Sequence, residues 1–136
     1  MFSPHPSHLS VHFHSMFIGE HDDLTAKPIV RSLSSIAREL GHTRIDVLKC
    51  DIEGSEFGIF EQFGKMAKTL RVEQLLLEVH LCDGFKCRFK EKRKSAEELY
   101  ALVAGVENAG LRLFHKEMNA RYSSFCAELA FVQSTF

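Results

Sequence analysis

The sequence predicts an α/β fold in which a mostly parallel sheet ends in an antiparallel hairpin. Segments with strand character alternate with segments of helical periodicity along most of the chain, an order typical of parallel strands joined by crossover helices. Two strand-like segments, residues 111–115 and 126–133, follow each other with no helix between them. A polar loop at 116–124 joins them, which predicts an antiparallel hairpin at one edge of the sheet.

Length and composition indicate one globular domain. The 136 residues are enough for one hydrophobic core and too few for two, and shares of 45% hydrophobic and 26% charged residues are ordinary. A formal net charge of -1 gives no overall field that would attract nucleic acid. No apolar run approaches the roughly 18 residues that span a bilayer, and the N-terminus lacks the pattern of a signal peptide. A cytoplasmic chain without a membrane segment is the default expectation.

The first part of the chain predicts one strand and one helix. Residues 1–10 are rich in proline, serine and histidine and are expected to form a frayed lead-in, with the folded domain over 11–136. Apolar and histidine side chains alternate in residues 11–18, as in a strand with one polar face. Residues 33–40 have apolar positions at helical spacing, and Gly41 is placed to end that helix in a left-handed conformation.

The middle of the chain predicts a buried strand followed by an aromatic helix. Residues 45–50 have the β-branched and aliphatic character of a strand covered on both faces, and Gly54 marks the turn that leaves it. An apolar stripe at helical spacing then ends at Gly64, and it consists of Phe57, Phe60 and Phe63. Such a stripe is far more often part of the core than of a cofactor pocket.

A further strand and helix complete the alternation. Residues 74–80 form another apolar run that ends in polar groups, as a buried strand does. Ser95 and Glu98 have the spacing of a capping box, which predicts the start of a helix. Apolar positions recur behind this cap, and Gly110 is expected to end the helix.

Acids and a histidine stand at the ends of two predicted strands. Asp51 and Glu53 follow one strand, and Glu78 and His80 close the next. Ligands of open α/β sheets bind beyond the carboxyl ends of the parallel strands, so these four side chains are candidate site residues. Residues i and i+2 of an extended chain project to the same side, which predicts that each pair converges. The alternative is that Glu53 and Glu56 cap the following helix at its positive dipole end.

The cysteines lack the C-x-x-C spacing of a common metal or redox site. Two of them lie in apolar runs, so buried free thiols in a reducing compartment are expected. A zinc site made of His80, Cys82, Cys87 and His115 is the weaker alternative, because its spacing matches no common zinc pattern. No metal ligand is therefore expected among the site residues, and no zinc in the purified protein.

A basic run with a single acid lies at residues 86–94. Charge runs in connections are usually solvated, and that interpretation is favoured here. The alternative is that this run lines the mouth of the site and attracts an anionic substrate.

One segment resembles a known enzyme family. Residues 45–56, Ile-Asp-Val-Leu-Lys-Cys-Asp-Ile-Glu-Gly-Ser-Glu, resemble the I-D-x-L-K-x-D-[IV]-E-G-x-E segment of the FkbM-like methyltransferases and their eukaryotic methyltransferase-like relatives. Residues 74–80 resemble the fifth strand of this group, and 117–119 with 128–132 resemble its closing hairpin. The similarity covers about residues 2–133. It implies the Rossmann-like sheet of class I S-adenosylmethionine-dependent methyltransferases, with the final strand inserted antiparallel between the two strands before it.

The resemblance is incomplete at the cofactor half-site. No pair of glycines follows a strand and opens a helix, so the family's glycine-rich loop has no counterpart. Ser3 stands where the family has an acid that binds the cofactor ribose. The chain is thus expected to be an N-terminally truncated domain that binds S-adenosylmethionine weakly on its own, with residues 11–18 deprived of their usual neighbour. Gly19 and Glu20 fall where the family contacts the adenine side of the cofactor.

Three functional hypotheses follow. The first is an S-adenosylmethionine-dependent methyltransferase acting on a hydroxyl of a small-molecule, glycan or lipid acceptor. The resemblance then implies catalytic roles for Asp51, Glu53, Glu78 and His80, with a carboxylate or the imidazole as base. The second is a non-catalytic binding module derived from such an enzyme. The third and weakest is a metal-dependent hydrolase in which the same four residues are ligands.

Overall fold

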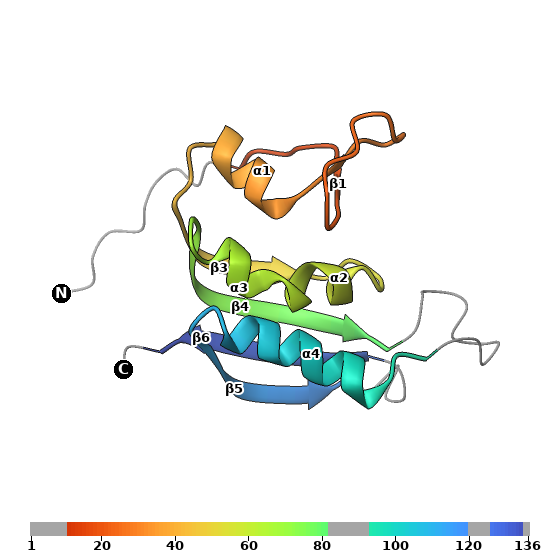
Figure 1. Ribbon diagram of the computed structural model, residues 1–136, viewed down its shortest axis with the longest axis vertical. Helices are drawn as coiled ribbons and strands as arrows, with labels where there is room; N and C mark the ends of the chain where they lie inside the picture. The colour runs from red at the N-terminus through yellow and green to blue at the C-terminus, as the bar shows by residue number, and fades with distance from the viewer. Residues whose placement is uncertain (1–10, 82–92, 120–125, 135–136) are drawn as a thin grey trace.

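The computed structural model describes residues 11–81, 93–119 and 126–134. Its main sheet has the strand order β3-β4-β6-β5 (Figure 1). These strands are β3 (Arg44–Cys50), β4 (Arg71–His80), β5 (Leu111–Met118) and β6 (Cys126–Gln133). β3 and β4 are parallel, whereas β6 runs antiparallel to both β4 and β5. The predicted hairpin, and the insertion of its last strand beside β4, are therefore confirmed.

The main sheet is mixed rather than mostly parallel. One of its three strand pairs in the described residues is parallel and two are antiparallel. Helices separate β3, β4 and β5 along the chain, so the predicted α/β class is confirmed. The Rossmann-like arrangement beyond β3 stays a prediction, and the expected lead-in at 1–10 lies outside the described residues.

A two-stranded sheet lies apart from the main one. β1 (Phe17–Ile18) pairs in parallel with β2 (Val30–Arg31). The strand predicted at 11–18 is wrong for most of its length, because only its last two residues pair, and Val11 and Phe13 are 88% and 87% exposed. No described strand lies beside residues 11–16, and alternation alone does not supply partners for backbone N–H and C=O groups.

Helices α1 (Leu33–Glu39) and α4 (Ala96–Glu107) lie where the sequence predicts them. The capping box of α4 is present: Ser95 N donates to Glu98 Oε2 at 2.8 Å, and Glu98 N donates to Ser95 Oγ at 3.2 Å. Glycines with positive φ follow both helices, Gly41 at 70° and Gly110 at 90°. Within the described segments no helix is both long and apolar enough to cross a bilayer.

The predicted aromatic helix is divided into α2 (Glu56–Glu61) and α3 (Phe63–Met66). Its apolar stripe is confirmed by the burial of Phe57, Phe60 and Phe63. The predicted stop at Gly64 is wrong, because this glycine lies inside α3. A Cβ at Gly64 would lie 3.1 Å from Asn108 Cβ, so the glycine lets α3 pack closely against the end of α4 rather than ending a helix.

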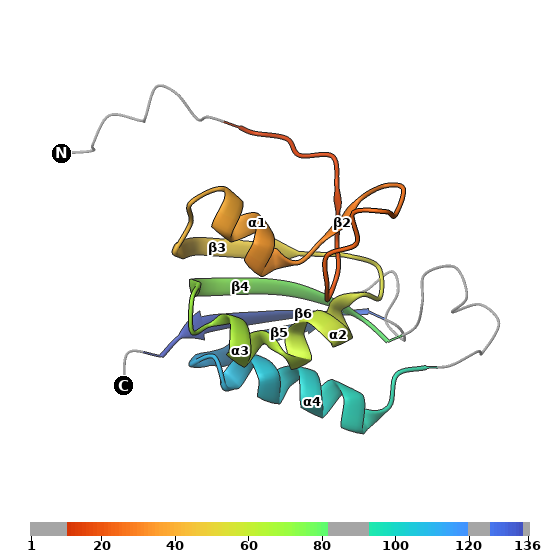
Figure 2. The same cartoon turned by 45° about the horizontal axis from the view of Figure 1, so that its top comes forward.

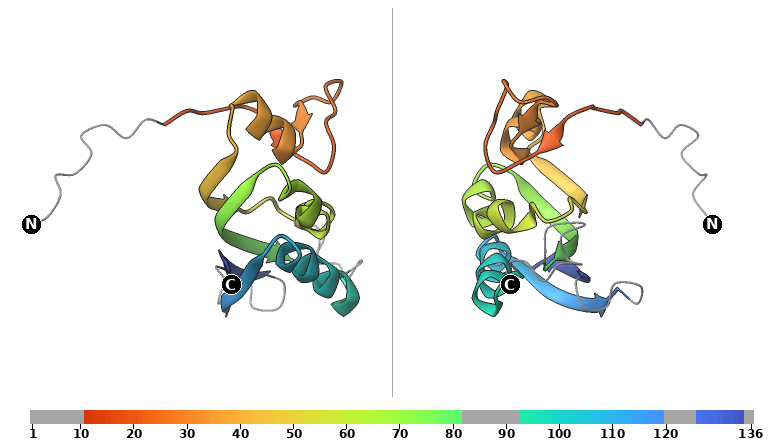
Figure 3. Two further views of the ribbon diagram at one scale, coloured as in Figure 1. Left: turned by 60° about the vertical axis from the view of Figure 1, so that its left-hand side comes forward. Right: turned by 90° about the vertical axis from the view of Figure 1, so that its right-hand side faces the viewer.

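Helices α2, α3 and α4 cover one face of the main sheet, and α1 lies beyond β3 (Figure 2). Leu75, Leu77 and Val79 occupy alternate positions of β4 and are fully buried in the core that these helices share. The opposite face carries no helix of the described segments (Figure 3). The prediction that the strand at 45–50 is covered on both faces is therefore wrong, and Val47 is 54% exposed.

Gly105 permits the close contact between α2 and α4. A Cβ at this position would collide with the backbone oxygen of Phe60 and lie 2.5 Å from that of Glu61. Only glycine allows the two helices to pack this closely. The contact fixes α2, whose first turn lies beside the ends of β3 and β4.

Candidate functional site

The parallel strands β3 and β4 end at the same edge of the sheet and bring acids and a histidine together. Asp51 follows the last residue of β3, and His80 is the last residue of β4. His80 Nε2 lies 3.7 Å from Asp51 Oδ1 and 3.6 Å from Glu53 Oε2. Three of the four residues that the sequence suggests as catalytic therefore meet.

A turn, not an extended strand, directs Glu53 toward His80. Glu53 has a φ of 54°, in the left-handed region that side chains other than glycine rarely adopt, and Gly54 follows at 108°. The i and i+2 geometry predicted for Asp51 and Glu53 is therefore wrong, although their carboxylates do converge. A left-handed backbone at a non-glycine residue costs about 1 kcal/mol, and such strain is concentrated at functional sites.

One buried carboxylate holds both this turn and the histidine. Glu56, the first residue of α2, is fully buried. Its carboxylate accepts the N–H of Ile52 at 3.2 Å and that of Gly54 at 3.0 Å. Its Oε1 atom also lies 3.0 Å from His80 Nδ1. An ionised carboxylate only accepts hydrogen bonds, so Nδ1 is assigned as the protonated nitrogen, and Nε2 faces the other two carboxylates.

Sequence reasoning gives Glu56 only the role of a helix cap, and misses its contact with His80. The overlooked signal is spacing. Glu56 precedes Phe60 by four residues and Phe63 by seven, which places it on the apolar stripe of the helix. An acid on a buried stripe requires partners inside the protein, and the turn and the imidazole supply them.

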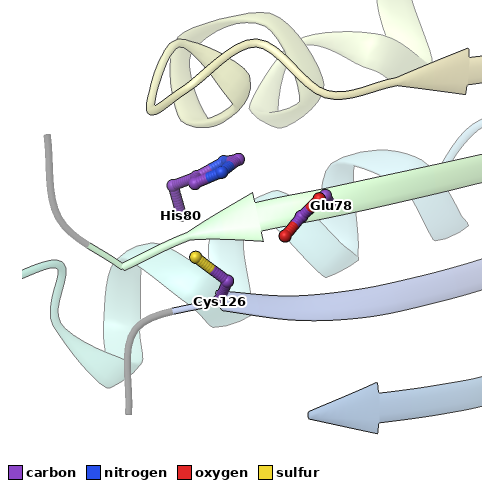
Figure 4. Close-up of side chains that lie close together, drawn as sticks. All are labelled: Glu78, His80 and Cys126. Atoms are coloured by element: carbon purple, nitrogen blue, oxygen red, sulfur yellow. The ribbon is translucent and has the colours of Figure 1, made fainter. Parts of the chain in front are cut away.

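Glu78 and Cys126 lie beside His80 at the ends of β4 and β6 (Figure 4). The strand register places Cys126 opposite His80, and the possible ligand atoms of the three residues lie within 4.8 Å of one another. Glu78 accepts a hydrogen bond from Asn119 Nδ2 at 3.1 Å. Burial, and then the charge of Glu78, raise the pKa of the Cys126 thiol. The sequence-predicted Glu78 thus borders the site beside Cys126.

The described thiols, Cys50 and Cys126, are free and buried, as the sequence predicts. Burial is the main cause that raises the pKa of Cys50 to about 12. Such thiols stay protonated and are poor nucleophiles. Of the alternative zinc ligands, Cys82 and Cys87 lie outside the described residues, and the His115 side chain is exposed on β5.

The two residues expected to contact a cofactor, Gly19 and Glu20, lie in a different place. They line a hollow of about 160 Å³ beside α1, α2 and α3, and none of the four predicted catalytic residues lines it. Glu20 accepts a hydrogen bond from Gln62 Nε2. A Cβ on Gly19 would lie 2.5 Å from Val30 Cγ1. A glycine is therefore needed here for the close approach to β2, whether or not a cofactor binds.

Residues 86–92 of the basic run at 86–94 lie outside the described residues. Lys94 donates a hydrogen bond to Glu98 Oε1 at 3.2 Å, and its Nζ lies 4.9 Å from the centre of the Phe57 ring. This lysine therefore belongs to the contact between α2 and α4.

Fold and site together define an α/β domain with a polar site at the carboxyl edge of its parallel strands. The family model described as the methyltransferase FkbM domain matches residues 2–122, and the chain therefore belongs to this family. The chain is similar to the probable methyltransferase-like protein 24 of Rattus norvegicus, with 36% identity over 86 residues, and to that of Homo sapiens, with 35% identity over 86 residues. Each alignment covers 62% of this chain but only 23% of the relative's length. No solved structure was found to match the chain.

Proposed function

We propose that the chain serves in a methyltransferase that uses S-adenosylmethionine and methylates a hydroxyl oxygen. Membership of the FkbM methyltransferase family supports methyl transfer. The observation that carries the choice of an oxygen acceptor is His80 Nε2, which faces Asp51 and Glu53 at 3.7 and 3.6 Å. A hydroxyl is a weak nucleophile at neutral pH and needs a base in such a position.

The charge of the site suits a cationic methyl donor. His80 and Cys126 lie among four carboxylates, those of Asp51, Glu53, Glu56 and Glu78. S-adenosylmethionine would supply an electrophilic methyl group on a positively charged sulfur. We place Gly19 and Glu20 on the adenine side of this cofactor, as the family resemblance implies.

Each side chain of the site would have its own role in the transfer step. His80 Nε2 would take the proton that the acceptor hydroxyl loses when its oxygen receives the methyl group, which S-adenosylmethionine would supply. Glu56 keeps its contact with Nδ1–H and stabilises the imidazolium that results. Asp51 and Glu53, whose side chains are 45% and 75% exposed, accept hydrogen bonds from the acceptor and orient its hydroxyl.

The test is transfer of a radiolabelled methyl group from S-adenosylmethionine to panels of small-molecule, glycan and lipid hydroxyls. Asp51→Asn removes a charge and keeps the shape of the side chain, and should lower transfer by at least about 100-fold. Asp46→Asn is the matched control, because Asp46 lies on β3 with a side chain that is 80% exposed and paired with Arg44. Circular dichroism should show that both variants fold.

Two outcomes would contradict the proposal. Near-normal transfer by Asp51→Asn would exclude a catalytic role for this carboxylate. A folded protein that binds cofactor or acceptor and transfers no methyl group to any acceptor class would favour the non-catalytic binding module.

A further inference from the structure

We propose that Asp51, Glu53 and His80 Nε2 form a binding site for one divalent transition-metal ion. This site shares residues with the proposed methyl transfer, and an ion bound to Nε2 would occupy the lone pair that serves there as the base, so the two states of His80 exclude each other. Metal binding is measured without the transfer reaction. The proposal replaces the sequence-based expectation that no site residue is a metal ligand. It takes three of the four ligands named in the weakest functional hypothesis, without the hydrolase activity, and none of the cysteines of the zinc alternative.

The distances fit ligands that flank a common ion. Possible ligand atoms of Asp51, Glu53 and His80 lie within 4.8 Å of one another. The separations of 3.7 and 3.6 Å between His80 Nε2 and the two carboxylates are longer than hydrogen bonds. Two ligand atoms that bind one ion at about 2.1 Å are themselves roughly 3.0–3.4 Å apart, so small side-chain rotations would complete the site.

The orientation of His80 supplies the second argument. Its side chain is only 8% exposed, and its Nδ1–H is held by the buried carboxylate of Glu56 at 3.0 Å. Nε2 thereby faces two carboxylates at 3.7 and 3.6 Å without a hydrogen bond to either. This arrangement directs three possible ligand atoms at one point. A carboxylate that fixes the far nitrogen of the imidazole is the usual outer partner of a metal-binding histidine.

Charge makes the third argument. Four carboxylates lie close to one imidazole: those of Asp51, Glu53 and Glu56 lie 3.7, 3.6 and 3.0 Å from ring nitrogens of His80, and that of Glu78 lies within 4.8 Å. The nearby described lysines have acidic partners elsewhere: Lys49 pairs with Glu128, and Lys94 pairs with Glu98. A divalent cation would offset much of this concentrated negative charge.

The donor set selects a class of ion. One imidazole nitrogen and two carboxylate oxygens suit Mn²⁺, Fe²⁺, Co²⁺ or Zn²⁺ better than Mg²⁺ or Ca²⁺, which prefer oxygen ligands throughout. Three protein ligands also leave coordination positions for water, as in catalytic rather than structural metal sites.

Titration with Mn²⁺, followed by electron paramagnetic resonance of the free ion, tests the proposal. The wild-type protein should bind one equivalent saturably. Glu53→Gln is the key variant, because the Glu53 side chain is 75% exposed and the substitution leaves the core intact. It should weaken binding at least about tenfold, as should Asp51→Asn, whereas the controls Asp46→Asn and His115→Gln should bind like wild type.

A second measurement uses the histidine itself. In nitrogen NMR, Zn²⁺ should shift the Nε2 signal of His80 to that of a metal-bound nitrogen, while Nδ1 keeps its proton and its contact with Glu56. The absence of saturable Mn²⁺ binding, binding unaffected by Glu53→Gln, or a His80 that stays an imidazolium when metal is added would each overturn the site. Metal binding without methyl transfer would contradict only the proposed function, and methyl transfer without metal binding would contradict only this inference.

Discussion

Glu56 joins three parts of the site through one buried carboxylate, which accepts two backbone N–H groups and contacts His80. We expect Glu56→Gln to lower the free energy of unfolding by about 2 kcal/mol, because the amide turns a donor toward groups that are donors themselves. Glu61→Gln, at an exposed position of α2, should change it by less than about 0.5 kcal/mol. Urea unfolding followed by circular dichroism measures both. Equal losses would show that the buried hydrogen bonds contribute nothing.

Glu53, unlike Glu56, is expected to serve function at a cost in stability. Its left-handed backbone is strained for a glutamate and relaxed for glycine. Glu53→Gly should therefore leave the free energy of unfolding unchanged or raise it by up to about 1 kcal/mol, while methyl transfer and Mn²⁺ binding are lost. Urea unfolding measures the change in stability, and the methyl-transfer and Mn²⁺-binding assays measure the two losses of function. A variant that is clearly less stable than wild type would mean that the Glu53 side chain has a structural role.

The residues of the site differ in how far the sequence predicts them. Asp51 and His80 are predictable because they depend only on where two parallel strands end. The position of Glu53 depends on a turn with positive φ, and the contact of Glu56 depends on how closely α2 approaches β4. These two features arise from tertiary packing, which local pattern does not contain.

The contact between α2 and α4 reverses the usual preference for alanine over glycine in a helix. Propensity alone would make Gly105→Ala stabilising by about 1 kcal/mol. The added Cβ would collide with the backbone of α2, so we expect the substitution to lower the free energy of unfolding by about 2 kcal/mol instead. Ala101→Gly in the same helix is the control and should cost about 1 kcal/mol. If Gly105→Ala proved more stable than wild type in thermal unfolding, the two helices would not be packed as described.

Helices and strands were predictable where local chemistry specifies their ends. The capping box at Ser95 and the left-handed Gly41 mark real boundaries of α4 and α1. The break at Gln62 has no such local signal and accompanies the close packing of α3 against α4 at Gly64. The strand predicted at 11–16 has no described neighbour. Periodicity shows which side of a segment is apolar, but not whether a partner is present.

The arrangement of the sheet predicts an order of hydrogen exchange. β4 and β6 have strand neighbours on both sides, whereas β3 pairs only with β4 in the described residues. Amides of β4 and β6 should therefore exchange slowest, and the amides of β3 that point away from β4 should exchange much faster. Amides at 11–16 should be among the fastest. Exchange followed by NMR distinguishes these groups, and uniform protection along β3 would reveal a partner on its outer edge.

The outer edge of β3 also affects whether copies of the chain associate. An unpaired strand edge is a template for another strand, and charged side chains along it oppose such pairing. Arg44, Asp46 and Lys49 are exposed at alternating or near-alternating positions of β3. Pairing with a second edge would remove water from these charged groups, and the cost of that desolvation keeps two copies apart. The same three side chains thus act as gatekeepers against aggregation, independently of any role of the site nearby.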